Sequence, residues 1–356
     1  MPLNKIDQVY IKHDDKTGLF AAIAIHDERN NPALGGCRCI HYDSEDDAIK
    51  DAINLAQTMS YKTAIAGVPF GGGKAVLMKP RVEYNRLAYF KSFGEFVEEL
   101  EGKFITGCDS GVTQEDMRIA SNYTSYMTAI PLGNQSNDYL IKLTGDGVLK
   151  SIEVALRKKL RKSNVKGLKI AIQGLGKVGY YIAHQLSSLG CHLIATDLDT
   201  NLTEKAKKEL GVKIVAPDDI YKSDCDIFIP CGLGGIINGT TVAQFNASII
   251  CGAANNQIET PEIGQKLLDR GIIYIPDFVA NVGGTIFAAG SYQGINYPKI
   301  EQYALKRIKG LILTILEISE LEKKPTNIVA LDLAYKIKTN LYRNSESASY
   351  ENNWII

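Results

Sequence analysis

Two lysines that could take part in chemistry, Lys62 and Lys74, enclose an apolar stretch that ends in three consecutive glycines, Gly71 to Gly73. Burial among apolar residues and the nearness of a second ammonium both favour the neutral form of a lysine. The glycines leave room for another molecule to approach the backbone. The pattern predicts a pocket that binds a small anion through one lysine and leaves the other for proton transfer. A strand–turn–strand segment with surface lysines explains the same residues equally well.

The same stretch is not a nucleotide P-loop. That motif consists of glycine, four residues, and then Gly-Lys followed by Ser or Thr. It would need glycine in place of Val68 and a hydroxyl in place of Ala75, and neither is present. The lysine pair is therefore not predicted to hold the phosphates of a nucleotide.

A glycine motif in the second half of the chain has the surroundings of a dinucleotide site. The motif GLGKVG at 174–179 follows a predicted strand at 168–173 and opens a helical pattern at 180–189. A second predicted strand, 191–196, leads to Asp197. Strand, glycine motif, helix, strand and acid follow one another in the order that a Rossmann unit requires.

Each glycine of this motif has an expected role. Gly174 makes the tight turn, Gly176 admits the pyrophosphate, and Gly179 lets the helix pack closely on the strand. An acid at the end of the second strand binds a ribose 2′-hydroxyl. The two carboxylates of Asp197 and Asp199, with no arginine nearby, would repel a 2′-phosphate, which favours NAD over NADP.

Further strands are expected at the rhythm of a parallel sheet covered by helices on both faces. They are 213–215, 227–229, 248–251 and 272–274. Ligands gather at the carboxyl ends of such strands, where the sequence places Cys231, Ala254, Asn255 and Asn281. The two asparagines are candidate partners of a nicotinamide carboxamide. They would also serve as ordinary turn residues.

Composition limits the function classes. The chain has 356 residues, enough for two domains, with 45% hydrophobic and 22% charged residues. Forty basic residues balance forty acidic ones, so no global field favours nucleic acid or an acidic membrane. A small-molecule ligand is the better expectation. The N-terminus lacks the apolar region of a signal peptide, and no apolar run approaches the roughly 20 residues of a membrane span.

The seven cysteines fit buried thiols in a reducing cytoplasm better than a disulfide framework. On a strand Cys37, Cys39 and His41 would share one face, which raises the possibility of a metal site. Because no CxxC or HExxH motif accompanies them, core thiols are favoured and no metal is predicted.

The first half is expected to be an α/β domain. A helix begins at Ser44, with Ile49, Ile53, Ala56 and Met59 as its buried stripe. The other predicted elements are strands at 8–12 and 19–25, a helix at 85–100, an apolar run at 104–111 that contains Asp109, and C-terminal helices at 301–319 and 327–342. From the residues alone, Asp109 is best explained as a turn aspartate.

At Pro32 to Gly36, Met59 to Lys62, Gly71 to Lys74 and Gly252 to Gln257 the chain resembles the glutamate/leucine/phenylalanine/valine dehydrogenase family, closest to its leucine dehydrogenase branch. The resemblance implies oxidative deamination of an L-amino acid with a nicotinamide cofactor in a usually oligomeric enzyme. It also implies two domains with the active site in the cleft between them. We expect a substrate domain over 1–140, to which residues 325–356 return, and a doubly wound Rossmann domain over 145–320.

The resemblance assigns roles to residues of this sequence. Lys62 would grip the substrate α-carboxylate, Lys74 would hold the attacking water, and Asp109 would relay protons to and from the amino group, in place of the turn role above. Leu34, Gly35, Gly36 and Gly72 are expected to contact the substrate. The residues expected to contact the cofactor are Thr144, Gly174, Gly176, Lys177, Val178, Gly179, Asp197, Cys231, Ala254, Asn255 and Asn281.

Leu34 indicates which class of substrate side chain the protein accepts. In the glutamate branch a lysine at this position binds the γ-carboxylate of the substrate, so a leucine here would leave that charge desolvated and unpaired. A branched-chain aliphatic amino acid is therefore expected, with leucine, isoleucine and valine left open. Phenylalanine or tryptophan is the alternative substrate.

Two departures from the family bear on activity. Cys108 replaces the usual acid before Asp109, and the segment 134–143 lacks the family's usual loop. A catalytically silent NAD-binding protein is therefore a competing hypothesis. A 2-hydroxy-acid dehydrogenase is disfavoured because none of the five histidines lies in a matching motif.

Overall fold

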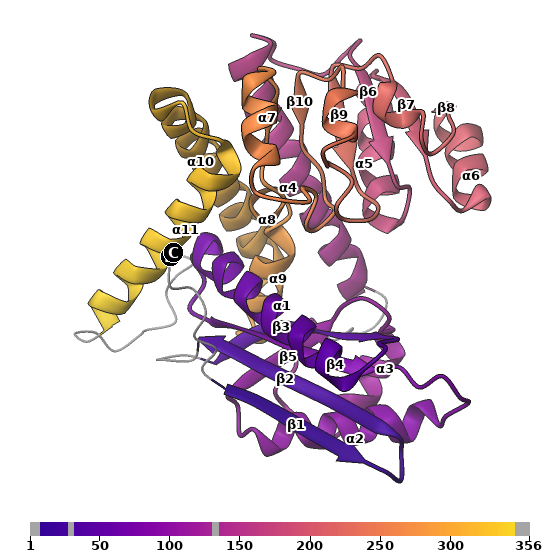
Figure 1. The fold of residues 1–356 in the computed structure, drawn as a ribbon, viewed down its shortest axis with the longest axis vertical. Coiled ribbons are helices and arrows are strands. Elements are labelled where there is room, and N and C mark those ends of the chain that lie inside the picture. Colours follow the sequence, from indigo (N-terminus) through magenta and orange to yellow (C-terminus); the bar gives the residue numbers. More distant parts are fainter. Residues whose placement is uncertain (1–7, 28–31, 130–134, 346–356) are drawn as a thin grey trace. The chain divides into compact units, whose positions relative to one another are not determined.

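The computed structural model describes residues 8–27, 32–129 and 135–345. The chain divides into two compact units, each assembled from several segments (Figure 1). Unit 1 comprises Met1–Asp138, Thr285–Ile300 and Ala334–Ile356, and unit 2 comprises Tyr139–Gly284 and Glu301–Leu333.

Unit 1 is built on a five-stranded mixed sheet with the strand order β1-β2-β4-β3-β5. Its strands are β1 (Gln8–Asp14), β2 (Leu19–Asp27), β3 (Ala33–Ile40), β4 (Gly71–Met78) and β5 (Phe104–Cys108). Strands β3, β4 and β5 run parallel, with β3 in the middle, so their carboxyl ends share one edge of the sheet. The two predicted N-terminal strands are confirmed.

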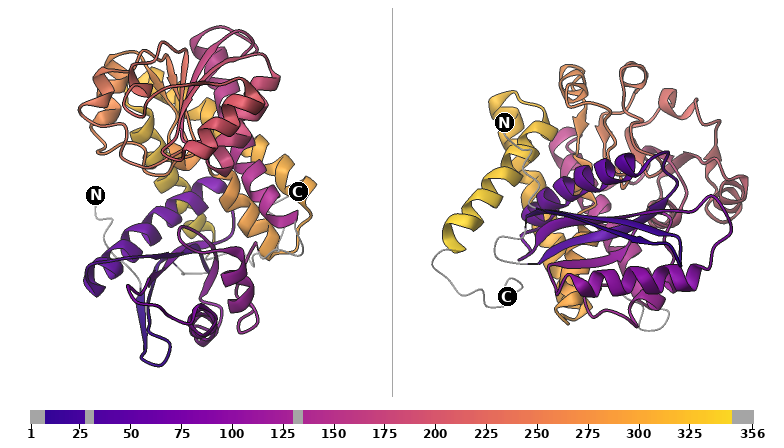
Figure 2. Two further views of the ribbon diagram at one scale, coloured as in Figure 1. Left: turned by 90° about the vertical axis from the view of Figure 1, so that its right-hand side faces the viewer. Right: turned by 60° about the horizontal axis from the view of Figure 1, so that its bottom comes forward.

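Two long helices cover opposite faces of this sheet, α1 (Glu45–Ala66) and α2 (Arg86–Glu99) (Figure 2). Alternation along β4 assigns its side chains to the two faces. Ala75 and Leu77 pack in the core that contains the phenylalanines of α2, whereas Val76 packs with the alanines of α1. The side of the sheet that faces α1 is therefore the side to which Lys74 belongs.

Helix α1 differs from the prediction in length and in its buried stripe. Ser44 caps it as expected, but it continues through Lys62 and ends at Gly67, whose φ is 69°. The strand–turn–strand interpretation is therefore wrong at its first lysine. The buried stripe is Ala48, Ala52 and Ala56, while the predicted Ile49, Ile53 and Met59 are only half-buried. Small residues are favoured because the helix lies very close to the sheet.

Later segments of the chain complete unit 1. They are α9 (Gly283–Tyr292) and the end of α11 (Thr326–Ser345), and the short α3 (Gln114–Ala120) follows β5. The Thr128 hydroxyl donates to the Ala288 carbonyl, the rings of Phe70 and Tyr292 meet edge to face, and Lys338 Nζ lies 3.4 Å from His26 Nδ1. These contacts join residues more than 150 positions apart within one unit.

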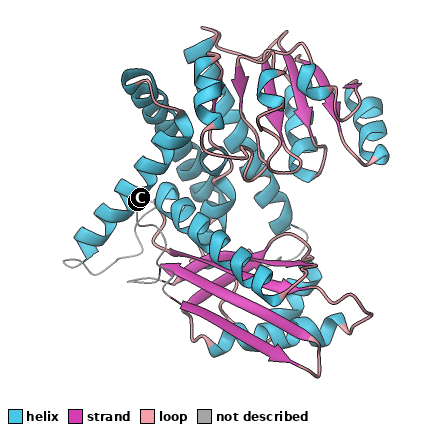
Figure 3. Ribbon diagram, viewed as in Figure 1, coloured by secondary structure: helices cyan, strands magenta, loops and turns pink. Residues whose placement is uncertain are grey.

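Unit 2 is built on a six-stranded parallel sheet with the order β11-β10-β9-β6-β7-β8. Helices flank the strands of this sheet (Figure 3). Its strands are β6 (Lys169–Gln173), β7 (His192–Thr196), β8 (Lys213–Ile214), β9 (Ile227–Pro230), β10 (Ile249–Ile250) and β11 (Ile273–Tyr274). The order reverses beside β6, as in doubly wound sheets. The parallel sheet and the strand positions predicted from the sequence are confirmed.

The remaining helical elements in the described ranges are α4 (Gln135–Lys159), α5 (Lys177–Ser188), α6 (Thr200–Leu210), η1 (Ile220–Lys222), η2 (Thr241–Ala243), α7 (Ile263–Asp269), α8 (Asp277–Ala280) and α10 (Tyr297–Glu322). Helix α4 already begins at Gln135, within the segment 134–143 that differs from the family. Residues 135–143 are therefore helical rather than an altered loop, and residue 134 lies outside the described residues.

All seven cysteines lie in the described ranges as thiols outside any disulfide, and Cys37 and Cys39 lie in the core of unit 1. Burial raises the pKa of Cys39 to about 11. His41 is exposed, and its Nδ1 lies 2.9 Å from the Lys79 carbonyl. Across the described ranges no group of three or more His, Cys, Asp or Glu side chains could hold a metal ion. None of the described helices has the length and apolarity needed to cross a membrane.

Candidate active site

Lys74 and Asp109 form a partly buried ion pair, with Lys74 in the middle of β4 and Asp109 directly after the end of β5. Lys74 lies on β4 with 6% of its surface exposed, and its Nζ donates to Asp109 Oδ2. A Cβ on Gly36 of β3 would lie 2.8 Å from the Asp109 Cβ and 3.3 Å from Lys74 Nζ. Gly36 therefore leaves the space in which the pair meets. Asp109 is more than a turn aspartate.

Asp109 carries a negative charge at neutral pH. Burial raises its pKa, but the ammonium of Lys74 and the guanidinium of Arg38 more than offset this effect. The pKa of Asp109 is consequently below its ordinary value. A carboxylate beside a lysine can exchange a proton with a bound group, as acid–base chemistry at an amino group requires.

The other residues predicted to contact the substrate differ in burial and in what their positions require. A Cβ on Gly35 would lie 1.8 Å from the Gly73 carbonyl oxygen, and one on Gly72 would lie 2.1 Å from the Ser60 nitrogen. These two positions require glycine for backbone packing. Leu34 is 1% exposed, and strand alternation places it on the same face as Gly36. Lys62 is half-buried in the penultimate turn of α1.

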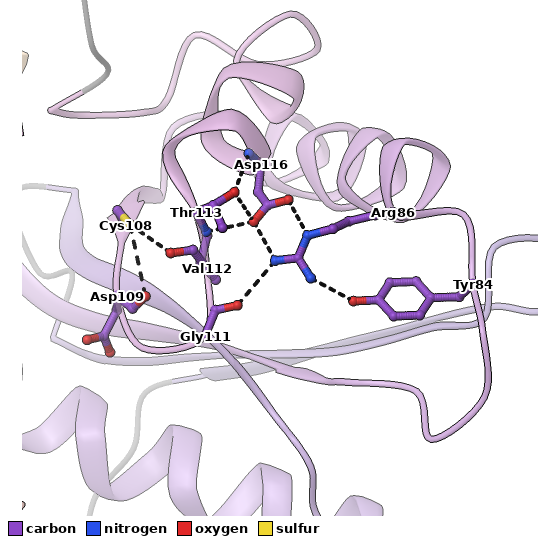
Figure 4. A network of polar contacts seen from close by, with 8 residues as sticks. All are labelled: Tyr84, Arg86, Cys108, Asp109, Gly111, Val112, Thr113 and Asp116. Atoms are coloured by element: carbon purple, nitrogen blue, oxygen red, sulfur yellow. Dashed lines mark hydrogen bonds and ion pairs between the residues drawn. The ribbon is translucent and has the colours of Figure 1, made fainter. Parts of the chain in front are cut away.

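The turn that carries Asp109 is held by a network that the sequence did not reveal (Figure 4). Gly111 has a φ of 77°, and a Cβ there would lie 1.9 Å from the Cys39 carbonyl oxygen. Arg86 donates through Nε and Nη2 to Asp116, and through Nη2 to the Gly111 carbonyl at 3.3 Å. The Asp109 carboxylate points away from this network in Figure 4. The network therefore supports the backbone and leaves the carboxylate to Lys74.

Cys108, the first departure noted in the sequence, takes part in the same turn. Its thiol donates to the Val112 carbonyl at 3.2 Å, and the Val112 amide donates to the Asp109 carbonyl at 3.2 Å. A glutamate at this position could not donate that hydrogen bond when ionised. Cys108 thus adds a contact within the turn.

Replacing Arg86 with Gln is expected to destabilise unit 1 by about 1–3 kcal/mol at pH 7, because the buried Asp116 carboxylate would lose its charged partner. Burial raises the pKa of Asp116, but Arg86 and Thr113 lower it on balance. The Arg86–Asp116 ion pair therefore contributes to the free energy of unfolding above about pH 4. This contribution is lost as the pH falls through the pKa of Asp116 in the folded state. Denaturant unfolding of both proteins at pH 7 and near pH 3 measures this difference.

Arg118→Gln is the matched control, since Arg118 pairs with Glu115 on the surface of the neighbouring helix turn. No measurable change is expected for it. A loss in Arg86→Gln that persists undiminished near pH 3 would contradict the electrostatic explanation.

The glycine motif of unit 2 has the expected local geometry. Gly174 has a φ of 97°, which favours glycine, and a Cβ on Gly179 would lie 2.1 Å from the Gly174 carbonyl oxygen. A Cβ on Gly176 would meet nothing within 4 Å. Gly176 caps α5, and Lys177 and Val178 form its first turn. The helix N-terminus is therefore open to an anion, as a pyrophosphate site requires.

Asp197 lies where β7 ends and is fixed from both sides. Its Oδ2 accepts from the Leu175 amide at 2.6 Å, and its Oδ1 accepts from the Asp199 amide at 2.9 Å. The carboxylate of Asp199 caps α6 by accepting from Asn201. Asp197 is thus held beside the glycine turn, in the position expected of a ribose-binding acid.

Asn255, in the loop after β10, lies close to Asn281, which ends helix α8. The Asn281 amide nitrogen donates to Asn255 Oδ1 at 2.9 Å and to the Ala253 carbonyl at 3.1 Å. Asn281 is 6% exposed, and its Oδ1 has no hydrogen-bond partner within the described part of the chain. A buried acceptor of this kind suits the amide group of a ligand.

The remaining residues predicted to contact the cofactor show no local geometry that is specific to a dinucleotide. Ala254 is buried, and Cys231 is half-buried after β9, where burial raises the pKa of its thiol to about 12. The Thr144 hydroxyl donates to the Leu140 carbonyl within α4 at 2.8 Å. A Cβ on Gly284 would lie 3.2 Å from that hydroxyl.

Comparison with known proteins decides the family. Residues 4–128 match the model described as Glu/Leu/Phe/Val dehydrogenase, dimerisation domain. Residues 140–201 and 196–294 match the model described as Glutamate/Leucine/Phenylalanine/Valine dehydrogenase. The chain belongs to the Glu/Leu/Phe/Val dehydrogenase family. The family and the class of amino-acid dehydrogenase expected from the sequence are confirmed.

Members of this family with different substrates are similarly close. The chain is 38% identical over 350 residues to the leucine dehydrogenase of Bacillus subtilis (strain 168), which covers 97% of this chain and 94% of that one. It is 36% identical over 342 residues to the L-tryptophan dehydrogenase of Nostoc punctiforme, covering 96% and 94%. The crystal structure of that tryptophan enzyme matches with a TM-score of 0.80 over 95% of this chain and 97% of that chain.

Proposed function

We propose that this protein catalyses the NAD-dependent oxidative deamination of a branched-chain aliphatic L-amino acid to the 2-oxo acid and ammonia. The observation that carries the proposal is the partly buried Lys74–Asp109 pair beside Gly36, on the sheet face that also bears Leu34. In this assignment unit 1 binds the substrate and unit 2 binds the dinucleotide.

Each residue of unit 1 has a defined part. Lys62 pairs with the substrate α-carboxylate. A bound nicotinamide would supply the hydride acceptor, and loss of a hydride from the substrate Cα would leave an iminium group on the substrate. Lys74 Nζ holds the water that attacks this carbon and accepts its proton. Asp109 exchanges a proton with the amino nitrogen, which leaves as ammonia. Water, amino acid and NAD⁺ thus give oxo acid, ammonium, NADH and one proton.

Residues of unit 2 fit a dinucleotide. The open N-terminus of α5 at Gly176 suits the pyrophosphate, and Asp197 suits an adenosine ribose with a free 2′-hydroxyl. The unpartnered Oδ1 of Asn281 suits the N–H of a carboxamide. Asp199 adds a second carboxylate near the ribose position, which supports NAD over NADP.

Leu34 supports an apolar substrate side chain. An anionic side chain next to this buried residue would be desolvated without a cationic partner. Leucine, isoleucine and valine differ by groups worth only about 1–3 kcal/mol in a pocket. The similarity to the L-tryptophan dehydrogenase favours an aromatic amino acid as the second candidate.

A substrate panel tests the proposal. Leucine, isoleucine, valine, phenylalanine, tryptophan and glutamate are each assayed with NAD and with NADP. We expect the highest kcat/KM for an aliphatic substrate with NAD, and rejection of glutamate by about 10³-fold or more. A higher kcat/KM for tryptophan or phenylalanine would replace the aliphatic assignment by the aromatic one.

Two other outcomes would refute the enzyme assignment. Oxidation of NADH with 4-methyl-2-oxopentanoate in the absence of ammonia would indicate a hydroxy-acid dehydrogenase. Binding of NAD in calorimetry without turnover of any amino acid would indicate a binding protein.

We further propose a homo-oligomer that forms through unit 1. The support is the match of residues 4–128 to a model described as a dimerisation domain. Light scattering coupled to size-exclusion chromatography should give a multiple of the 39.0 kDa chain mass. A monomer at micromolar concentration would contradict this.

A further inference from the structure

Arg38 links the Lys74–Asp109 pair to helix α1. It lies two residues after Gly36 on β3 and so shares the sheet face of the pair. Its Nη1 donates to Asp51 Oδ2 at 2.9 Å, and its Nε lies 3.8 Å from Asp109 Oδ2. The Nε group is buried and makes no hydrogen bond to any described residue. The Arg38 guanidinium therefore lies between two carboxylates. It is hydrogen-bonded to Asp51 and lies farther from Asp109.

A third residue, Tyr42, also holds the Asp51 carboxylate to which Arg38 is bonded. The Tyr42 hydroxyl donates to the same Asp51 oxygen at 2.5 Å. The Arg38 side chain is 22% exposed, so its charge is only partly screened by water. Burial lowers the pKa of Arg38, but Asp109 and Asp51 raise it on balance. Arg38 is thus a permanently charged group held at a set distance from Asp109.

The two cations near Asp109 differ in one respect. In the proposed reaction Lys74 gains and loses a proton, whereas an arginine stays protonated at every working pH. Whenever Lys74 is neutral, Arg38 is the cation that still faces the Asp109 carboxylate. We propose that Arg38 is a positioning residue that keeps the Asp109 carboxylate ionised and directed at Lys74 while the charge of Lys74 changes. This inference deepens the proposed function and rests on it.

Few described groups near Asp109, apart from Arg38 and Lys74, could influence the ionisation of its carboxylate. The charged or titratable groups around it are Lys74 on β4, Arg38 and Cys37 on β3, Cys108 on β5, and Asp51 of α1 beyond Arg38. Burial raises the pKa of Cys37 well above its ordinary value, so that thiol is neutral. Among the residues that the structure describes, Lys74 and Arg38 are therefore the cations whose charges lower the pKa of Asp109.

The first test does not require turnover. The carboxyl ¹³C resonance of Asp109, assigned by its loss in Asp109→Asn, is titrated in the wild type and in Arg38→Gln. We expect the midpoint to rise by about one pH unit in Arg38→Gln, because a cation within about 4–6 Å is lost. Arg81→Gln is the control with the same change in net charge, since Arg81 pairs with Asp43 on the surface. Equal midpoints in wild type and Arg38→Gln would overturn the proposal.

The second test follows the pH dependence of kcat/KM. In Arg38→Gln we expect the acidic limb to move to higher pH and kcat to fall at least about tenfold, with KM for the oxo acid within about threefold. Arg38→Lys, which keeps the charge, should retain the limb of the wild type while kcat falls. A rise in KM with an unmoved limb would assign Arg38 to direct substrate binding and overturn the proposal.

The two tests separate the two proposals. If no amino acid is turned over but the Asp109 midpoint shifts, the proposed function fails while the effect of Arg38 on Asp109 stands. If the wild type is active and Arg38→Gln changes neither the midpoint nor kcat, the inference about Arg38 fails alone. Should Arg38→Gln not fold, a shifted acidic limb in Arg38→Lys would refute the charge argument.

Discussion

Lys74→Ala is expected to lower kcat for ammonia-dependent NADH oxidation by about 10³-fold or more, which is the range of a lost general acid–base group. The variant removes the ammonium that pairs with Asp109 and, in the proposed mechanism, holds the attacking water. The site of the change lies in unit 1, so calorimetric binding of NAD should be unchanged. Steady-state kinetics with 4-methyl-2-oxopentanoate and ammonium measure the loss.

Lys79→Ala is the matched control for this experiment. Lys79 follows the same strand, is exposed, and differs from Lys74 in having no carboxylate partner in the described structure. Its replacement should leave kcat within about twofold of the wild type. Retention of more than a tenth of the wild-type kcat in Lys74→Ala would exclude Lys74 as the group that activates water.

Gly36→Ala is expected to reduce kcat by about 10²-fold, the cost of moving a reacting group by about 1 Å. Its new methyl group would lie 2.8 Å from the Asp109 Cβ and 3.3 Å from Lys74 Nζ, so at least one partner must shift. Single-turnover kinetics separate this loss from any change in substrate binding. Because the methyl carries no charge, the effect reports on geometry alone.

Gly310→Ala gives the comparison for Gly36→Ala. Nothing lies within 4 Å of a Cβ at Gly310, which lies inside helix α10. There alanine should raise the stability slightly, because glycine costs about 1 kcal/mol in a helix interior, and kcat should not change. Full activity of Gly36→Ala would mean that the reaction does not depend on the Lys74–Asp109 geometry.

The parallel sheet of unit 2 was predictable because its signals are local. Apolar runs separated by helical stretches give strands, and the glycines at 174 and 179 each meet a steric need that follows from the Rossmann turn, whereas a Cβ at Gly176 would meet only open space. The acid at the end of the second strand follows from the same pattern. In this half of the chain, neighbouring residues in the sequence determine the position of the site.

Unit 1 was less predictable because its site depends on residues distant in the sequence. The sequence pattern alone did not distinguish Asp109 from a turn residue, since its partner lies 35 positions away on β4. The buried stripe of α1 was predicted correctly at Ala56 but not at the two isoleucines and Met59, because the helix packs on the sheet through small alanine side chains. Arg38 and Arg86 gave no signal, since an arginine on a strand or at a helix start is ordinary until its carboxylates are known.

The discontinuous make-up of unit 1 has a practical consequence for dissecting the protein. A fragment that stops at Asp138 would keep the whole sheet with Lys74 and Asp109 but lack the two late segments that complete the unit. It would leave Phe70 without its aromatic neighbour Tyr292 and Thr128 without its acceptor at Ala288. A soluble excised half, or a chimera that exchanges halves between relatives, must therefore splice the late segments back in, so that recombination at a single junction is expected to yield misfolded protein.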